Sequence, residues 1–230
     1  MNPSPCCVLF DLDGTLVDTY SLYMEAFRFT LEPHFKRRLN DTELLALDPY
    51  AEQRLLLNVL PEGDFNESFE NFLSQYARFH EPLFGGPYEG VMDMLKTLQA
   101  RGHVLGVVTG KSREAWRITA TRMEEQGFDD FFEIVLTDDD VQLPKPSPEG
   151  LLLALDTLEL GPEQAIYIGD SQRDYEAAEA AGLPFGAALW SHAPGRRSFA
   201  DPVSDSEVGH TFHRPSDVVT ALARQETSHR

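Results

Sequence analysis

Two carboxylates in the segment FDLDGTLVD, residues 10–18, carry the clearest chemical signal in the sequence. Asp11 directly follows an apolar run that is typical of a strand, and Asp13 stands two positions later, just before a glycine. The side chain of Asp11 and the main-chain carbonyl of Asp13 can bind one divalent cation, which leaves the Asp13 carboxyl free for proton transfer. The segment therefore predicts a metal-assisted acid–base site, and a plain acidic turn after a strand is the alternative interpretation.

A hydroxyl group and an ammonium group follow later in the chain. Thr109 ends the apolar run in VVTGKS, residues 107–112, and can donate its hydroxyl to a phosphate oxygen. The segment is not a nucleotide-binding P-loop, because that motif requires a glycine where this chain has Leu105. Lys145 lies between two prolines, which restrict the backbone on both sides and give its positive charge a fixed origin. Taken singly, the two residues are more typical of a turn and of a solvated surface.

A second acidic pair occurs in the segment YIGDSQRDYEAAEAAGLP, residues 167–184. Asp170 falls in the turn after an apolar run, and Asp174 follows one helical turn later, so both carboxylates lie on the same side. This spacing suits Asp170 as a metal ligand and Asp174 as a group that holds the metal site or Lys145 in place. Acidic residues at a helix start also occur without any such role, because they interact favourably with the helix dipole.

Four short apolar runs stand close to these polar residues, and their content of β-forming residues predicts buried strands. The runs are residues 6–10, 103–108, 131–136 and 165–169. Helical patterns precede the last three runs and occupy residues 91–101, 113–126 and 148–158. Strands that alternate with helices in this way predict an α/β fold with a doubly wound parallel sheet. Because such sheets bind ligands at the carboxyl ends of their strands, the polar residues there should meet on one rim.

Residues from about 19 to 80 interrupt this alternation and show helical patterns alone. The segment EPLFGGPYEG, residues 81–90, is rich in glycine and proline, as expected of a hinge that leads back into the main fold. The sequence thus predicts an α/β core made of residues 1–16 and 84–230. A helical cap domain, residues 17–83, is inserted after the first strand.

The charge and cysteine content of the chain limit its partners and its location. The 38 acidic and 19 basic side chains give a formal net charge of -19, which repels nucleic acids and anionic membranes. A phosphate site in such a protein must bring its own positive charge. Cys6 and Cys7 are adjacent and cannot join distant segments, so a reducing, cytoplasmic location is the simplest expectation. The sequence leaves a monomer and a homodimer open.

The motifs D-x-D-G-T and GDSxxDxxAAxxAG, with Thr109 and Lys145 between them, resemble those of the haloacid dehalogenase (HAD) superfamily. The resemblance extends from Val8 to about Leu189 and implies the Rossmann-like core of that superfamily. The helical insert resembles the cap of its phosphoglycolate phosphatase and β-phosphoglucomutase group. Dehalogenases of the superfamily lack an acid at the position of Asp13, so the resemblance implies a phosphatase.

The resemblance also implies a role for each residue of the motifs. Asp11 would be the nucleophile that forms an aspartyl phosphate, and Asp13 would protonate the leaving group and later activate water. Asp11, the Asp13 carbonyl and Asp170 would bind Mg²⁺, while Asp174 would orient Lys145 or a metal-bound water. The residues that would hold the phosphate are Leu12, Asp13, Thr109, Gly110 and Lys145.

The substrate that the resemblance implies is a small phosphorylated metabolite, which the cap would select. Phosphoglycolate phosphatases commonly carry a G-x-P element in the cap, whereas residues 45–54 of this chain are LALDPYAEQR. Arg54 in this segment is a candidate contact for a second anionic group, although charged residues on a cap helix usually face solvent. A phosphosugar mutase is the alternative enzyme, and a phosphate-binding module without activity is the alternative outside catalysis.

Overall fold

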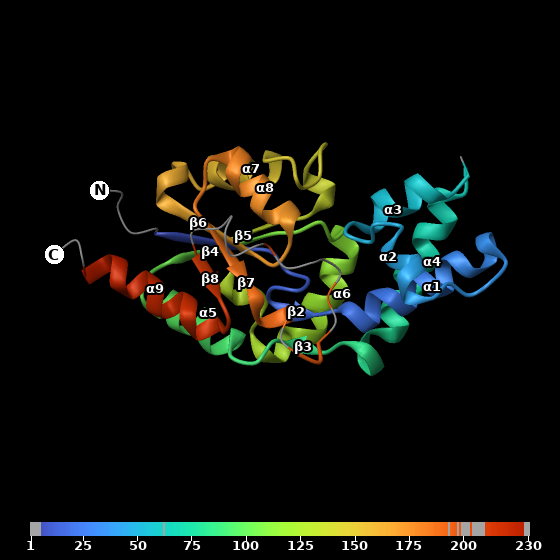
Figure 1. Ribbon diagram of the computed structural model, residues 1–230, viewed down its shortest axis with the longest axis horizontal. Coiled ribbons are helices and arrows are strands. Elements are labelled where there is room, and N and C mark those ends of the chain that lie inside the picture. Colours follow the sequence, from blue (N-terminus) through green and yellow to red (C-terminus); the bar gives the residue numbers. More distant parts are fainter. Residues whose placement is uncertain are drawn as a thin grey trace.

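The computed structural model describes residues 6–61, 63–192, 194–196, 198, 203 and 210–227. These residues form a six-stranded main sheet with helices on both faces, and a group of further helices lies beyond one end of it (Figure 1). Among the helices in this described part of the chain, none combines the length and the hydropathy that a membrane span requires.

The main sheet has six strands in the order β5-β4-β1-β6-β7-β8, and every neighbouring pair is parallel. The strands are β1 (Cys7–Phe10), β4 (Val104–Val108), β5 (Ile134–Leu136), β6 (Ala165–Gly169), β7 (Phe185–Ala188) and β8 (His210–Phe212). From β1 the chain first fills one side of the sheet with β4 and β5, and later the other side with β6. The strand order therefore reverses beside β1, and the predicted doubly wound parallel α/β fold is confirmed.

Both faces of the sheet are buried, which explains the continuous apolar runs in the sequence. Val8 and Phe10 of β1 face one core cluster, while Cys7 and Leu9 face the other, as the alternation of side chains along a strand requires. One face is covered by α5 (Val91–Ala100), α6 (Arg113–Met123) and α9 (Pro215–Thr227), and the other by α7 (Glu149–Thr157) and α8 (Gln172–Ala181) (Figure 1). Each large apolar side chain buried in this way contributes about 1.5–3 kcal/mol.

Two short strands, β2 (Val17–Asp18) and β3 (Gly86–Pro87), form a separate antiparallel pair where the insert leaves and rejoins the core. The sequence patterns did not predict this pair, because two-residue strands show no periodicity. They also missed β7 and β8, since Gly186 and two alanines give β7 little β-forming character.

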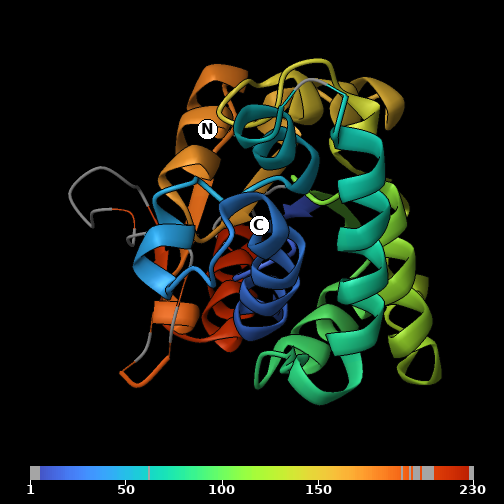
Figure 2. The same cartoon turned by 90° about the vertical axis from the view of Figure 1, so that its right-hand side faces the viewer.

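The insert consists of helices α1 (Tyr20–Phe35), α2 (Asp41–Leu45), α3 (Glu52–Val59) and α4 (Phe65–Leu83). Figure 2 looks onto this end of the molecule and shows α1 beside α4, with α6 of the core on the far side of α4. Aromatic rings hold α1 and α4 together, with ring centroids 4.7 Å apart for Phe27 and Phe72 and 5.2 Å apart for Tyr23 and Tyr76. The limits 17–83 for a cap domain stay a prediction.

Candidate active site

Strands β1 and β6 bring two acidic side chains to the same rim of the sheet. Asp11 follows β1, and its N–H donates to the carbonyl of Ile168 in β6 at 2.8 Å, which fixes its backbone. Asp170 follows β6, and both aspartates are buried. The turn after Asp11 depends on Gly14, which has a φ of 88° and where a Cβ would lie 2.3 Å from Oδ2 of Asp170. Glycine therefore allows the two strand ends to approach each other.

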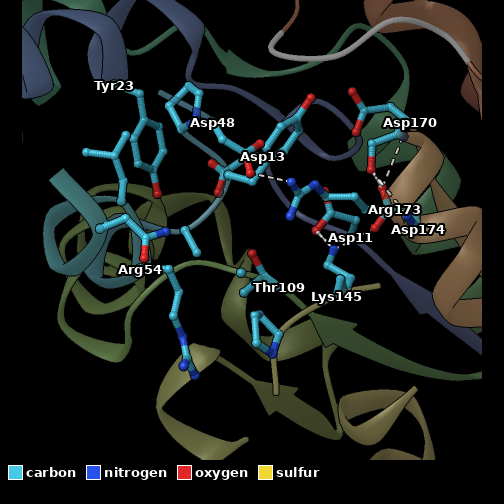
Figure 3. A pocket seen from close by; sticks show the side chains of 18 of the residues that line it. Asp11, Asp13, Tyr23, Asp48, Arg54, Thr109, Lys145, Asp170, Arg173 and Asp174 are labelled. Carbon is cyan, nitrogen blue, oxygen red and sulfur yellow. Dashed lines mark hydrogen bonds and ion pairs between the residues drawn. The ribbon is translucent and has the colours of Figure 1, made fainter. Parts of the chain in front are cut away.

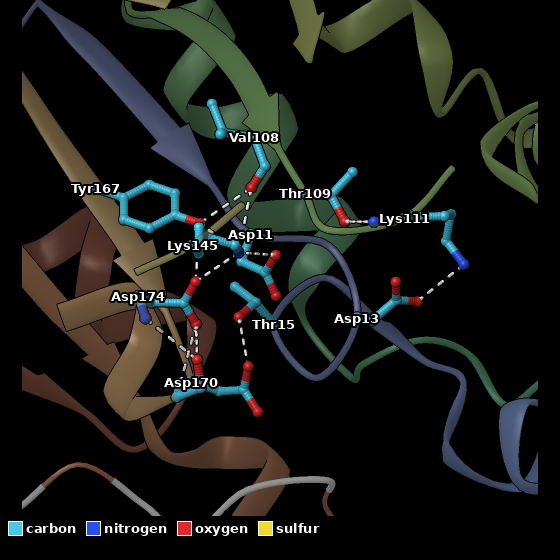
Figure 4. A network of polar contacts seen from close by, with 11 residues as sticks. Asp11, Asp13, Thr15, Val108, Thr109, Lys111, Lys145, Tyr167, Asp170 and Asp174 are labelled. Carbon is cyan, nitrogen blue, oxygen red and sulfur yellow. Dashed lines mark hydrogen bonds and ion pairs between the residues drawn. The ribbon is translucent and has the colours of Figure 1, made fainter. Parts of the chain in front are cut away.

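Lys145 connects the two acidic motifs. Its Nζ donates to Oδ1 of Asp11 and to Oδ1 of Asp174, each at 2.6 Å, and to the Tyr167 hydroxyl at 2.9 Å (Figure 4). Burial by itself lowers the pKa of Lys145, but the charges of Asp11 and Asp174 outweigh burial and raise that pKa well above its usual value. The ammonium group is therefore charged at neutral pH and lies against the predicted nucleophile.

Asp174 uses both of its carboxylate oxygens within the protein. Oδ1 accepts from Lys145 and from the Tyr167 hydroxyl, and Oδ2 accepts from the Ser171 N–H at 3.1 Å and the Ser171 hydroxyl at 2.5 Å. The bonds with Ser171 form a capping box that begins α8. Although burial raises the pKa of Asp174, Lys145 and Ser171 outweigh burial and lower it. Asp174 is thus an ionised support for Lys145, with its oxygens already engaged.

Asp11, Asp170 and Asp174 form a buried acidic cluster in which one carboxylate oxygen from each residue lies within 4.8 Å of the other two. Burial raises the pKa of Asp11 to about 7, although Lys145 opposes this shift. Burial and the charge of Asp11 raise the pKa of Asp170 well above its usual value. The bonds that the Asp170 oxygens accept from the hydroxyls of Thr15, Ser191 and Ser198 are long, at 3.3, 3.5 and 3.4 Å, so they hold these oxygens less firmly than the bonds of Asp174 hold its own. A divalent cation with oxygen ligands fits this excess of negative charge.

Thr109 and Gly110 follow β4 on the next part of the rim. The Thr109 N–H donates to the carbonyl of Leu136 in β5 at 2.9 Å, and the Thr109 hydroxyl accepts from the N–H of Lys111 at 3.2 Å. The hydroxyl proton can therefore be donated to a ligand. A Cβ at Gly110 would lie 2.7 Å from the carbonyl oxygen of Tyr50, so glycine lets the loop before α3 reach this strand end.

Asp13 lies apart from the acidic cluster and toward the insert (Figure 4). Its Oδ1 accepts from the Thr19 hydroxyl at 2.7 Å, and Nζ of Lys111 lies 3.2 Å from the same oxygen. The two carboxylates of the first motif therefore have different cations beside them, because Lys145 contacts Asp11 and Lys111 contacts Asp13.

A pocket of about 330 Å³ lies between the rim and the insert (Figure 3). Its core wall includes Asp11, Asp13, Thr109, Gly110, Lys145, Asp170 and Asp174, and the insert supplies Tyr23, Asp48, Tyr50, Ala51 and Arg54. The structure thus brings the predicted catalytic, metal and phosphate residues together on one wall. The exception is Leu12, whose side chain is fully buried in the core, so its backbone is the part that can serve a ligand.

Arg54 lines the pocket, but its guanidinium group is turned toward the core. Its Nε lies 3.1 Å from Oδ2 of Asp138, and its NH2 donates to the carbonyl of Gln142 at 3.1 Å. The candidate for a second anion therefore already has a buried carboxylate partner. A substrate would have to compete with this partner for Arg54.

Sequence reasoning missed two charged residues of this region. Arg173, in the first turn of α8, forms an ion pair with Asp48 of the insert and lies 4.6 Å from the ring centroid of Tyr50. Lys111 is almost completely buried beside Asp13. Both stand within three residues of a predicted site residue at a strand end. This closeness in the sequence could have indicated that they belong to the site.

Comparisons with known proteins place the chain among hydrolases. The family model described as haloacid dehalogenase-like hydrolase matches residues 8–188. The pyrophosphatase PpaX of Bacillus pumilus is 33% identical over 190 residues, which cover 80% of this chain and 83% of that protein.

Two solved structures are similar in fold. CbbY from Rhodobacter sphaeroides, in complex with phosphate, has a TM-score of 0.79 at 19% identity and covers 94% of this chain and 98% of its own. A putative phosphoglycolate phosphatase from Lactobacillus plantarum has a TM-score of 0.73 at 23% identity, with 96% and 99% covered. At these identities the two structures bear on the fold alone.

Proposed function

This chain belongs to the haloacid dehalogenase-like hydrolase family, and from that membership we propose that it is a Mg²⁺-dependent phosphatase of a small phosphate monoester. The resemblance read from its motifs is thereby confirmed at the level of the family. The proposal is supported above all by the contact between Asp11 and Lys145 inside an acidic cluster that includes Asp170. The proposed nucleophile, a fixed cation and the proposed carboxylate ligands for a divalent ion would thus share one pocket.

The first chemical step is a displacement at phosphorus. A carboxylate oxygen of Asp11 forms a bond to phosphorus while the bond from phosphorus to the ester oxygen breaks, which leaves an aspartyl phosphate. Lys145 and the Thr109 hydroxyl hold the oxygens of the transferred group and stabilise the charge that develops on them. The backbone groups proposed to assist them belong to Leu12, Asp13 and Gly110.

The acidic cluster is proposed to hold the metal. The carboxylates of Asp11 and Asp170 and the carbonyl of Asp13 would bind Mg²⁺, which when bound offsets the negative charge of the phosphate and of the cluster. Asp174 keeps Lys145 in place through its 2.6 Å contact and needs no contact with the metal for this role.

Asp13 is proposed to move the protons. Its carboxyl donates a proton to the departing ester oxygen, and the resulting carboxylate then accepts a proton from the water that attacks phosphorus. This attack breaks the bond between Asp11 and phosphorus and releases inorganic phosphate. Asp11 must stay ionised to attack phosphorus, and bound Mg²⁺ would favour its carboxylate against the burial that raises its pKa.

The pocket supports a small substrate. Its volume of about 330 Å³ lies at the lower end of ligand pockets, which span about 300–1,000 Å³. Pyrophosphate is a second candidate, because a relative of 33% identity is named a pyrophosphatase. The same displacement would serve either compound, with an alcohol or a phosphate as the leaving group. Phosphoglycolate belongs to the first class of substrate but is not preferred within it, because the cap segment lacks the G-x-P element.

The test is a phosphate-release assay with Mg²⁺ and then with EDTA. The substrates are phenyl phosphate, sugar phosphates, phosphoglycolate, nucleoside monophosphates and pyrophosphate. We expect Asp11→Asn to lose activity by about a thousandfold or more, because the nucleophile is removed. Asp156→Asn, an exposed substitution on α7, is the matched control and should behave as wild type. Undiminished activity of Asp11→Asn would contradict the proposal, and an isomerised sugar phosphate without phosphate release would indicate a mutase.

A further inference from the structure

Lys111 is a buried lysine that the proposed mechanism leaves without a role. It lies in the loop between β4 and α6, two residues beyond Thr109, and only 1% of its surface is exposed. Burial lowers the pKa of a lysine, but Asp13, Tyr76 and Glu52 outweigh burial here and raise the pKa of Lys111. A buried ammonium group is stable only when it is paired and hydrogen-bonded, so the partners of Lys111 are informative.

The insert supplies two of these partners. Nζ of Lys111 donates to the Tyr23 hydroxyl at 2.7 Å and to the Tyr76 hydroxyl at 2.8 Å. The same nitrogen lies 4.3 Å and 4.6 Å from the centroids of the two rings, so each ring also interacts with the charge. Tyr23 comes from α1 and Tyr76 from α4. The ammonium group is therefore held between two helices of the insert.

The two tyrosines are themselves fixed by hydrogen bonds. The Tyr23 hydroxyl donates to Oε1 of Glu52 in α3 at 2.6 Å, and Oε2 of Glu52 accepts from the Ser112 N–H at 2.7 Å. The Tyr76 hydroxyl lies 2.9 Å from the Thr119 hydroxyl of α6. The network thus runs from the core loop into the insert and returns to the core, which gives Lys111 a single, well-defined position.

We propose that Lys111 is the positioning residue of Asp13, and this inference rests on the proposed function. Lys111 contacts Oδ1 of Asp13 (Figure 4). The Thr19 hydroxyl donates to the same oxygen, so Oδ1 is held by two groups and Oδ2 is left to exchange the proton with the leaving group. Because Tyr23 and Tyr76 hold Lys111, the helices of the insert determine where the proton donor stands.

Leaving groups of different basicity separate this role from a purely structural one. Phenyl phosphate releases a basic phenolate and depends on a well-placed proton donor, whereas p-nitrophenyl phosphate releases a weakly basic one and depends on it little. A displaced Asp13 therefore slows phenyl phosphate more than p-nitrophenyl phosphate. Loss of folded protein lowers both rates by the same factor.

The experiment compares kcat/KM for the two aryl phosphates in Lys111→Met, with Mg²⁺ present, because kcat/KM reports the step in which the leaving group departs and not the later hydrolysis that both substrates share. Methionine keeps the length and apolar character of the buried stem but removes the charge and the hydrogen bonds. We expect the ratio of kcat/KM for phenyl phosphate to kcat/KM for p-nitrophenyl phosphate to fall about tenfold or more, since general acid catalysis contributes about 10²–10⁴. Lys96→Met, an exposed substitution on α5, is the matched control and should keep the wild-type ratio.

Tyr76→Phe provides the same test with a smaller change, and it decides the matter if Lys111→Met does not fold. It removes one hydrogen bond to Lys111 and keeps the ring, so the ratio should fall about threefold. An unchanged ratio in a folded Lys111→Met, or in Tyr76→Phe where the first variant does not fold, overturns the inference. Active Asp11→Asn would instead overturn the proposed function, so the two failures can be told apart.

Discussion

The core wall of the pocket and its mouth hold their charged groups in different ways. On the core wall, the side chains of Lys145, Asp11 and Asp174 are 16%, 9% and 1% exposed and contact one another directly. At the mouth of the pocket, between core and insert, Arg173 and its partner Asp48 are 36% and 53% exposed. Arg54 is also 36% exposed, but its partner Asp138 is only 3% exposed. Removing one partner of a buried pair costs about 3–5 kcal/mol, whereas an exposed pair contributes about 0–1 kcal/mol. The charged groups of the core wall are thus held more firmly than the exposed pair of Arg173 and Asp48.

Among substitutions in these two regions, Lys145→Met should have the largest effect on stability and activity. It leaves Asp11 and Asp174 close together without their cation, so the free energy of unfolding should fall by about 3 kcal/mol. Activity should fall by about a hundredfold or more, because the phosphoryl oxygens lose a positive donor. Urea unfolding and phosphate release measure the two effects, with Lys96→Met as the control. Stability equal to that of the wild type would show that the core wall tolerates the loss of a charged partner as well as the mouth of the pocket does.

Asp174→Asn should have the next largest effect. The amide keeps the shape of the side chain but removes the charge beside Lys145, so the lysine is oriented less firmly. We expect kcat to fall about 10- to 100-fold with a small change in KM if, as proposed, Asp174 holds Lys145 in place without binding the substrate. Steady-state kinetics measure both constants, and Glu179→Gln on the same helix is the control. A change confined to KM would contradict this role.

The acidic cluster predicts a stability that depends on pH and on Mg²⁺. The pKa of Asp11 is raised from 3.8 to about 7, so the folded chain binds more protons than the unfolded chain between these values. The contribution of Asp11 to stability is therefore complete below about pH 4 and is lost as the pH rises through about 7. Mg²⁺ favours the ionised carboxylates, so it should raise the Tm more at about pH 7.5 than at about pH 5.

Thermal unfolding with Mg²⁺ or EDTA at the two pH values measures this difference. Asp11→Asn removes one titrating carboxyl and should lose most of the dependence on Mg²⁺. Burial also raises the pKa of Glu52 to about 7, so the contribution of Glu52 to the stability of the protein is lost in the same pH range. Since Glu52 lies outside the acidic cluster, its share should be the same with and without Mg²⁺. An effect of Mg²⁺ that is equal at both pH values would argue against metal binding at the cluster.

Substitutions at the mouth should have the smallest effects. Arg173→Gln breaks the pair with Asp48, and we expect it to change the free energy of unfolding by less than about 1 kcal/mol. If Arg173 leaves Asp48 to bind a second phosphate, KM for pyrophosphate should rise several-fold while KM for phenyl phosphate stays nearly constant. Asp48→Asn, which releases Arg173 from its partner, is the matched control and should not raise KM for pyrophosphate. Equal changes in KM for both substrates would rule out a role in selectivity.

The residues that line the core wall could be predicted from the sequence because most of them follow neighbouring parallel strands. Asp11, Thr109 and Asp170 each follow a strand, and β4, β1 and β6 are neighbours in a parallel sheet. Their side chains must therefore meet on one rim, whatever the loops between them do. Lys145 enters from a loop, and its position could be expected from the motif that it resembles. The roles of these residues in catalysis stay predictions until the variants are measured.

The contacts between core and insert could not be predicted in the same way. Lys111 and Tyr23 are 88 positions apart and meet only because α1 packs against α4 and both lie near the loop after β4. A charged residue in a helix or loop usually faces solvent, so pattern alone gives no reason to bury Lys111 or Glu52. Arg54 was found as a candidate from its charge and its place in the insert, and its role with a substrate stays a prediction.

The Tyr50 carbonyl fits against the core because position 110 has no side chain. A Cβ at Gly110 would lie 2.7 Å from that oxygen, inside the 3.0 Å that real Cβ atoms keep, so a single methyl group would act as a wedge between the two layers. The distance between the core rim and the loop before α3 thus depends on the absence of a side chain at position 110. Gly110→Ala would force the Tyr50 carbonyl and the rim apart and change the shape of the pocket between them.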